Sequence, residues 1–313
     1  MQEMPAPPAR FRSDVWPLGP GRPRRKAGTG RLGVALLLAA CAIGPPSEVV
    51  APGPLRVRIG PIDPVALAAA ANEPPRGLRE RTDYLVDLLW EAGCPAVEMP
   101  QIDESRSRRS DVVCSLPGRS PDRILVLAHL DRAVDESGMP RHWRGVALLP
   151  FLYRALGVEE REHSFEFAAL ASRPPPRRFG EYVRRRREPL GEDIRAVVEI
   201  VDLDPSVLAF ASADAGLSQD FVSTGLAAGF PLDSVLRVTG SRAGRRGSVP
   251  TIAIVHPPET GGREELPPVA ASRGGEPASY HSAARVVAVY LGYLDGTLSL
   301  RAGAAPQAGD GAH

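Results

Sequence analysis

A histidine and a carboxylate directly after a buried strand are the first residues whose types and spacing could do chemistry. His129 and Asp131 follow the uninterrupted apolar run 124–128. Such a short run, bounded by turn residues, is typical of a strand buried on both faces of a parallel sheet. Open α/β sheets keep their active sites at the carboxyl ends of these strands. We therefore expect His129 and Asp131 at an active-site edge.

Two other element ends carry residues of the same kind. The apolar run 194–203 contains Asp202 near its end and is followed by Asp204, and His281 precedes a helix predicted over 283–294. Two histidines and one carboxylate are a recognised zinc ligand set. The alternative is that each of these residues is an ordinary polar residue at the end of an element.

The elements that must position these residues alternate between strand and helix. Apolar periodicity predicts helices over 79–92, 145–156 and 283–294, and strands over 111–116, 124–128, 164–171, 194–203 and 250–255. This alternation predicts an α/β protein, a three-layer α/β/α sandwich with a mostly parallel central sheet. No linker separates a second core, so we expect one domain over 56–300 and a disordered tail over 301–313.

The N-terminal region has the order of features found in an export signal. A basic segment precedes the short apolar run 32–40, which ends in small residues and Cys41. The run is too short to span a bilayer, and the arrangement resembles a bacterial lipobox. We expect a signal segment over 1–41 with Cys41 lipidated, a Pro-rich tether over 42–55, and a location in the bacterial cell envelope, facing the periplasm or exterior. The alternative is a false start codon followed by an ordinary apolar stretch.

Charge and cysteine content narrow the choice of partners. The net charge of +1 argues against nucleic-acid binding, which requires a basic field. In an exported protein Cys94 and Cys114 could form a disulfide, and the alternative is two separate buried thiols. Contact with a membrane is expected through the lipid anchor only.

Seven short segments occur in the order of a known enzyme family. They are DVVCSLPG, LAHLD, GVALL, FEFAALAS, VDLD, RGSVPTI and YHS. Together they resemble the secreted di-zinc aminopeptidases of the aminopeptidase S and aminopeptidase Y type, over most of residues 79–294. The resemblance implies a zinc-exopeptidase-like fold.

The resemblance also implies roles for individual residues. His129, Asp204 and His281 match metal ligands of that family, with Asp202 as the competing choice for the third strand. Asp131 matches the carboxylate that orients the first histidine. A zinc ion held by His129, Asp204 and His281 alone is chemically reasonable.

Two essential positions of the family pattern are changed in this chain. Arg141 or a neighbour stands where a carboxylate should bridge two metal ions, and 171–173 reads Ala-Ser-Arg where a Glu pair should stand. Serine and arginine can neither bind zinc as carboxylates nor take a proton from zinc-bound water at neutral pH. We therefore expect a degenerate family member that has lost hydrolysis. It would bind a peptide or another anionic ligand, with Arg141 and Arg173 as anion contacts.

The competing hypothesis is an active zinc aminopeptidase with relocated ligands. In that case Asp135 or Glu136 would bridge the metal ions, and Glu181 would act as the base. Other enzyme classes are not indicated, because the sequence has no G-x-S-x-G elbow, phosphate-binding P-loop or G-x-G-x-x-G fingerprint.

Overall fold

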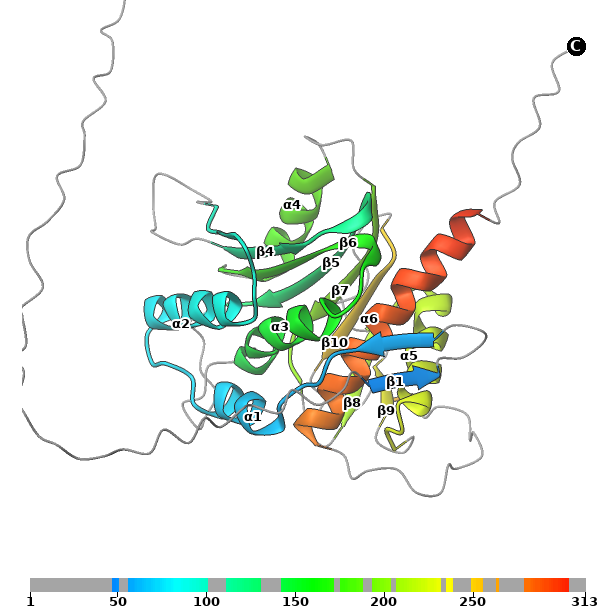
Figure 1. The fold of residues 1–313 in the computed structure, drawn as a ribbon, viewed down its shortest axis with the longest axis horizontal. Helices are drawn as coiled ribbons and strands as arrows, with labels where there is room; N and C mark the ends of the chain where they lie inside the picture. Colours follow the sequence, from blue (N-terminus) through cyan, green and yellow to red (C-terminus); the bar gives the residue numbers. More distant parts are fainter. Residues whose placement is uncertain are drawn as a thin grey trace, which may run out of the picture. The chain divides into compact units, whose positions relative to one another are not determined.

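Nine strands form one mixed sheet within the described part of the chain (Figure 1). In spatial order they are β11 (Arg263–Glu264), β9 (Val235–Val238), β8 (Leu208–Ser212), β10 (Thr251–Val255), β7 (Ile194–Ile200), β5 (Gly118–His129), β6 (Arg161–Leu170), β4 (Val112–Leu116) and β3 (Val97–Glu98). The central strands β10, β7, β5 and β6 are parallel, and β8 and β4 flank them in the antiparallel direction. The centre of the predicted, mostly parallel sheet is therefore parallel within a mixed sheet, and β8 and β9 also pair parallel.

This computed structural model describes eleven segments of the chain. They are residues 47–50, 56–100, 111–130, 142–171, 175–187, 193–203, 207–231, 235–238, 249–255, 263–264 and 279–303. All of them belong to the compact unit Ile43–His313. Several residues singled out from the sequence lie outside the described segments, namely Cys41, Asp131, Asp135, Glu136, Arg141, Arg173 and Asp204.

Helices cover both faces of the sheet, as Figure 1 shows. One face packs against α1 (Pro64–Asn72), α2 (Leu78–Glu91), α3 (Trp143–Leu156), α5 (Ala215–Ala227) and α6 (Tyr280–Gly303). The other face packs against α4 (Pro175–Arg187) through Tyr182 and Val183. These three layers are the predicted α/β/α sandwich.

The apolar run of β5 is buried on both faces, as its composition predicts. Ile124, Val126 and Ala128 contribute to the core under α3 and α6, whereas Leu125 and Leu127 contribute to the core under α4. Successive side chains of a strand point to opposite faces, so a strand between two helix layers needs apolar residues at every position. The run therefore places β5 in the middle of the sheet.

Two helices are longer than their predicted ranges. α3 begins at Trp143 and keeps Pro150 buried in its interior. α6 runs from Tyr280 to Gly303 and so extends past 301, where the disordered tail was expected to begin. None of the described helices has the length and apolar character needed to cross a membrane.

A small second sheet contradicts part of the predicted tether. β1 (Ser47–Val50) pairs antiparallel with β2 (Arg56–Ile59), so residues 47–50 are not a tether. The strand residues of both segments are rich in β-branched valine and isoleucine, which favour strands. Val57 and Ile59 of β2 are buried in the main core, which attaches this hairpin to the domain.

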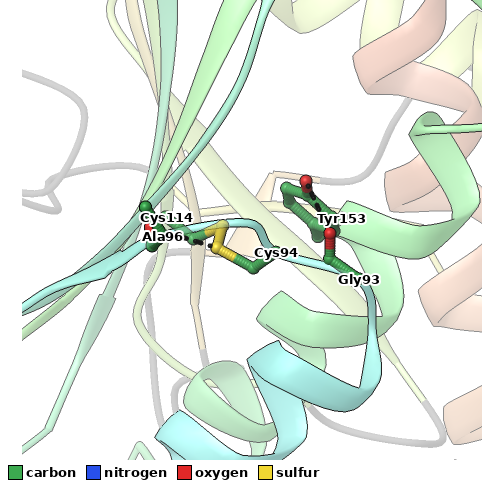
Figure 2. The surroundings of a disulfide bond; sticks show 5 residues. All are labelled: Gly93, Cys94, Ala96, Cys114 and Tyr153. Carbon is green, nitrogen blue, oxygen red and sulfur yellow. Dashed lines mark hydrogen bonds between the residues drawn. A yellow bond between two sulfur atoms is a disulfide. The ribbon is translucent and has the colours of Figure 1, made fainter.

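A disulfide joins Cys94 to Cys114, as Figure 2 shows. Cys94 follows the end of α2, and Cys114 lies in the middle of β4. The same turn is held from the other side, because the Tyr153 hydroxyl donates a hydrogen bond to the Gly93 carbonyl. Of the two alternatives open from the sequence, the structure contains the disulfide.

Candidate functional site

The starts of helices α3 and α6 lie near the carboxyl ends of the parallel strands. His129 is the last residue of β5, and its register partner on β6 is Leu170. The next amide, that of Leu130, donates to the Leu170 carbonyl at 3.0 Å. His129 therefore lies at the sheet edge where the sequence predicted an active site.

His129 is bound to a buried carboxylate on the neighbouring strand. Its Nε2 lies 2.8 Å from Oε1 of Glu199 on β7, and the two side chains are 2% and 0% exposed. Glu199 is the register partner of Leu127, and Leu127 and His129 point to the same face of the sheet. The register of two parallel strands therefore creates this pair, and the pair ties the strands together beyond their backbone ladder.

A second histidine packs against this pair at the start of α3. The rings of His129 and His142 meet edge-on, with centroids 5.9 Å apart and an interplanar angle of 62°. His142 is the N-cap of α3, and its φ of 64° is left-handed. Such backbone geometry costs about 1–3 kcal/mol in a non-glycine residue and is often found at functional sites.

The start of α3 is fixed closely against β7 and α6. A Cβ atom on Gly145 would lie 2.8 Å from the Ile200 carbonyl oxygen, so only glycine allows this approach. The Tyr280 hydroxyl donates to the Arg144 carbonyl at 2.5 Å. Burial raises the pKa of the Tyr280 phenol well above its usual range, and the nearby Asp202 carboxylate adds to the rise. Asp202 itself accepts the Leu203 amide at 2.8 Å.

The predicted ligand His281 makes a backbone contact. Its Nε2 lies 3.0 Å from the carbonyl oxygen of Ile62, just before α1. Because a carbonyl only accepts, Nε2 carries the proton and donates. In this structure Nε2 of His281 therefore makes a hydrogen bond to the backbone.

The end of β6 is also occupied by contacts within the protein. The Ala171 amide donates to Oδ1 of Asp111 at 2.8 Å. At this end of the strand the sequence reads Ala-Ser-Arg, where the resemblance implied a Glu pair. The backbone donor at this position is satisfied by Asp111, and the Ala171 side chain is apolar and buried.

The described residues do not fit a zinc centre. No group of three His, Cys, Asp or Glu side chains within the described segments is placed to hold a metal ion. Of the predicted ligand set, His129 and His281 are described and bind Glu199 and Ile62 respectively, whereas Asp204 lies outside the described residues. The orienting residue Asp131 and the anion contacts Arg141 and Arg173 lie outside them as well.

Sequence reasoning missed Glu199 and His142. Glu199 interrupts a run of buried apolar residues, and a carboxylate in such a position needs a polar partner. That signal was available in the sequence, although the identity of the partner was not. His142 gave no comparable signal, because its role depends on the backbone conformation at the start of α3.

Comparison with solved structures shows the fold. A leucine aminopeptidase precursor from Bacteroides thetaiotaomicron matches with a TM-score of 0.52 and 15% identity, over 75% of this chain and 98% of that one. A Bacteroides thetaiotaomicron glutaminyl cyclase, solved with N-acetylhistamine, matches with 0.52 and 16%, over 76% and 98%. A Fimbriiglobus ruber glutaminyl cyclase matches with 0.51 and 11%, over 74% and 95%.

The structural likeness covers 95–98% of those chains, although the sequence identity is only 11–16%. No protein-family model matches this chain, and no curated protein does. The chain therefore has the α/β fold of the leucine aminopeptidase precursor and the glutaminyl cyclases that it matches. The predicted fold class is confirmed.

Proposed function

We propose that this chain is a peptidase-like binding domain that has lost zinc-dependent hydrolysis. The observation that carries this proposal is the buried, apolar Ala171 at the end of β6, where the resemblance to the aminopeptidases implies a carboxylate pair. His129 in turn contacts Glu199 at 2.8 Å, with both side chains buried. A buried carboxylate on the ring nitrogen gives the histidine a protein partner within the core. Burying either group alone would be costly, so the two stabilise each other in place.

The other residues near the carboxyl ends of the strands support the same proposal. His281 donates to the Ile62 carbonyl, and the β6 end presents the buried Ala171. The sequence adds Ser172 and Arg173 at that end, where a general base would need a carboxylate. A strand end without this carboxylate lacks the general base that hydrolysis needs.

We further propose that the protein is exported and anchored through a lipid on Cys41. The basic segment, apolar run and cysteine of the N-terminal region motivate this proposal. The disulfide between Cys94 and Cys114 supports it, because structural disulfides persist in oxidising compartments such as the periplasm. Mass spectrometry of membrane-extracted protein tests it, and a mature chain that retains residues before Cys41 without an acyl mass would contradict it.

A second candidate is an active zinc enzyme, either an aminopeptidase or a glutaminyl cyclase. It is favoured by the other nitrogen of His129, since Nδ1 has no hydrogen-bond partner among the described residues. A metal-bound histidine commonly has its second nitrogen held by a carboxylate, as Glu199 holds Nε2 here. The remaining ligands would have to come from residues outside the described segments.

One set of measurements separates the two candidates. Purified protein is analysed for zinc, then assayed for hydrolysis of an aminoacyl-p-nitroanilide and for cyclisation of an N-terminal glutaminyl peptide, each with added Zn²⁺ or with EDTA. We expect no stoichiometric zinc and no turnover above the EDTA-treated sample. EDTA-sensitive turnover that disappears in His129→Ala would contradict the binding-domain proposal and support the active enzyme.

A further inference from the structure

Helix α4 carries a concentration of positive charge that the rest of the chain does not share. Its 13 residues contain six arginines and one glutamate, Glu181, which gives the helix a net charge of +5. The net charge of the whole chain is only +1, so the remainder of the chain is net negative. Charge concentrated on one element produces a local positive field that attracts anions whatever the net charge of the protein.

The inner side of α4 is fixed to the sheet and uses one of these arginines. Tyr182 and Val183 are buried in the same core as the apolar residues of β5. The Tyr182 hydroxyl donates to Oε1 of the fully buried Glu166 at 2.5 Å, and Nε of Arg186 lies 3.0 Å from the same oxygen. Figure 1 shows α4 on the opposite side of the sheet from α2 and α3. One side of α4 is therefore occupied by the sheet, and the other faces away from it.

The outer side of α4 presents arginines without acidic partners. Arg184 and Arg185 are exposed. Within the described part of the chain, the ion pairs of α4 are those that Arg186 makes on the inner side. Arg177 and Arg178 precede the exposed pair by seven residues, a spacing that places helical residues on the same side. The positive charge of α4 is thus directed away from the core.

We propose that the outer side of α4, which carries Arg184 and Arg185, binds the anionic headgroups of a phospholipid bilayer. Guanidinium groups bind phosphate oxygens through two parallel hydrogen bonds, and basic residues close to an anionic lipid surface strengthen binding to it. The exposed residues described on α4 are Gly180, Arg184 and Arg185. None of them offers the apolar anchor found at the centre of a protein interface. A flat surface of repeated negative charge therefore fits α4 better than a protein partner does.

Nucleic acid is the other repeating polyanion, and the net negative remainder of the chain opposes it. The inference goes beyond the proposed function, because it concerns the surface on which the domain rests and not the reaction or its loss. It also adds a second membrane contact to the lipid anchor, through which alone the sequence predicted one.

Sedimentation of the full chain with lipid vesicles measures this binding. The probes are vesicles of phosphatidylglycerol, which is anionic, and of phosphatidylcholine, which has no net charge. We expect partition onto the anionic vesicles only. Raising the salt from about 0.1 M to about 1 M should release the protein, since exposed charges are then screened. Equal partition onto both kinds of vesicle would overturn the proposal.

Two matched variants locate the binding, because the basic segment before Cys41 can bind the same vesicles. Arg184→Gln with Arg185→Gln should lower the partition coefficient about 25-fold, since each arginine near an anionic surface strengthens binding about fivefold. Arg76→Gln with Arg79→Gln removes the same charge from exposed positions around the start of α2, on the other side of the sheet, and should change the coefficient less than about twofold. Equal partition of the two variants would overturn the proposal. Both should keep the thermal midpoint of the wild type, because the replaced side chains are exposed.

A DNA duplex and poly-glutamate serve as competing polyanions. We expect the protein to bind phosphatidylglycerol vesicles at a lower concentration of negative charge than either competitor. Tighter binding of one competitor, lost in the α4 variant, would assign this surface to nucleic acid or to an acidic protein and overturn the lipid assignment. Zinc content and EDTA-sensitive turnover are measured independently, so failure of the α4 surface leaves the proposed function standing.

Discussion

Asp295 of α6 accepts hydrogen bonds from both the backbone amide and the ring of His163, at 2.8 and 3.1 Å. The Glu162 amide donates to its other oxygen at 3.1 Å. A single buried carboxylate thus fastens α6 to the amino end of β6, the opposite end from His129. Since α6 also supplies Tyr280 at its start, this contact helps to set the position of the helix at the site edge.

We expect Asp295→Ala to lower the free energy of unfolding by about 2–4 kcal/mol, because three donors lose a charged acceptor and two of them are backbone amides. Urea denaturation followed by circular dichroism measures this change. Asp87→Asn, on the exposed face of α2, is the control and should change stability little. A change below about 1 kcal/mol in Asp295→Ala would show that water replaces the carboxylate.

The pair of His129 and Glu199 predicts a strong coupling. Glu199→Ala should destabilise the protein by about 3–5 kcal/mol, since it leaves the buried ring without its partner. The double variant His129→Leu with Glu199→Leu should be more stable than either single leucine variant, because it removes both polar groups together. A double-mutant cycle measures the coupling, and additive effects would contradict a direct interaction.

Glycine substitutions test the close packing of α3 on β7. Gly145→Ala should cost about 1–3 kcal/mol, because the new Cβ would lie 2.8 Å from the Ile200 carbonyl oxygen. Gly180→Ala is the matched control, since a Cβ there meets nothing within 4 Å and the residue lies within α4. That variant should gain about 0.5–1 kcal/mol of helix stability. Thermal denaturation should show a lower midpoint for Gly145→Ala and a higher midpoint for Gly180→Ala.

The disulfide should contribute measurably to stability. Its cysteines are 20 residues apart, and closing a loop of that size restricts the unfolded chain by about 3 kcal/mol. Cys94→Ser with Cys114→Ser should therefore lower the denaturation midpoint, and dithiothreitol should have the same effect on the wild type only. An equal response of the wild type and the variant to the reductant would contradict a role for this bond.

Tyr182, which is buried, and Tyr280, which is partly buried, predict a loss of stability in alkali. Burial raises the pKa of Tyr182 and Tyr280 well above the usual value near 10. Above about pH 10 the unfolded chain releases these protons and the folded chain keeps them, so stability falls as the pH rises further. Absorbance at alkaline pH should show that part of the six tyrosines ionises only on unfolding. Complete ionisation of the folded protein near pH 11 would contradict this.

Patterns along the sequence were sufficient to predict the fold class. The run 124–128 predicted a central strand, and β5 is buried on both faces there. The alternation of strands and helices predicted the layers. These features depend on local periodicity and burial, which neighbouring residues determine.

Contacts between distant segments were not predictable in the same way. The pairing of His129 with Glu199 depends on the register of β5 against β7, where Leu127 faces Glu199. His281 contacts the carbonyl of Ile62, 219 residues earlier in the chain. The sequence pattern predicts that polar residues gather at the carboxyl ends of the strands. Strand register and helix placement decide which of these residues become partners.

The pairing of β1 with β2 has a consequence for how far the domain could reach. Ser47 is already part of the hairpin, so only residues 42–46 separate Cys41 from the folded unit. Five extended residues span at most about 18 Å. With the proposed lipid on Cys41, the domain would remain close to the membrane surface, and its ligands would have to be delivered there. A partner located farther from the membrane would have to span the remaining distance with its own chain.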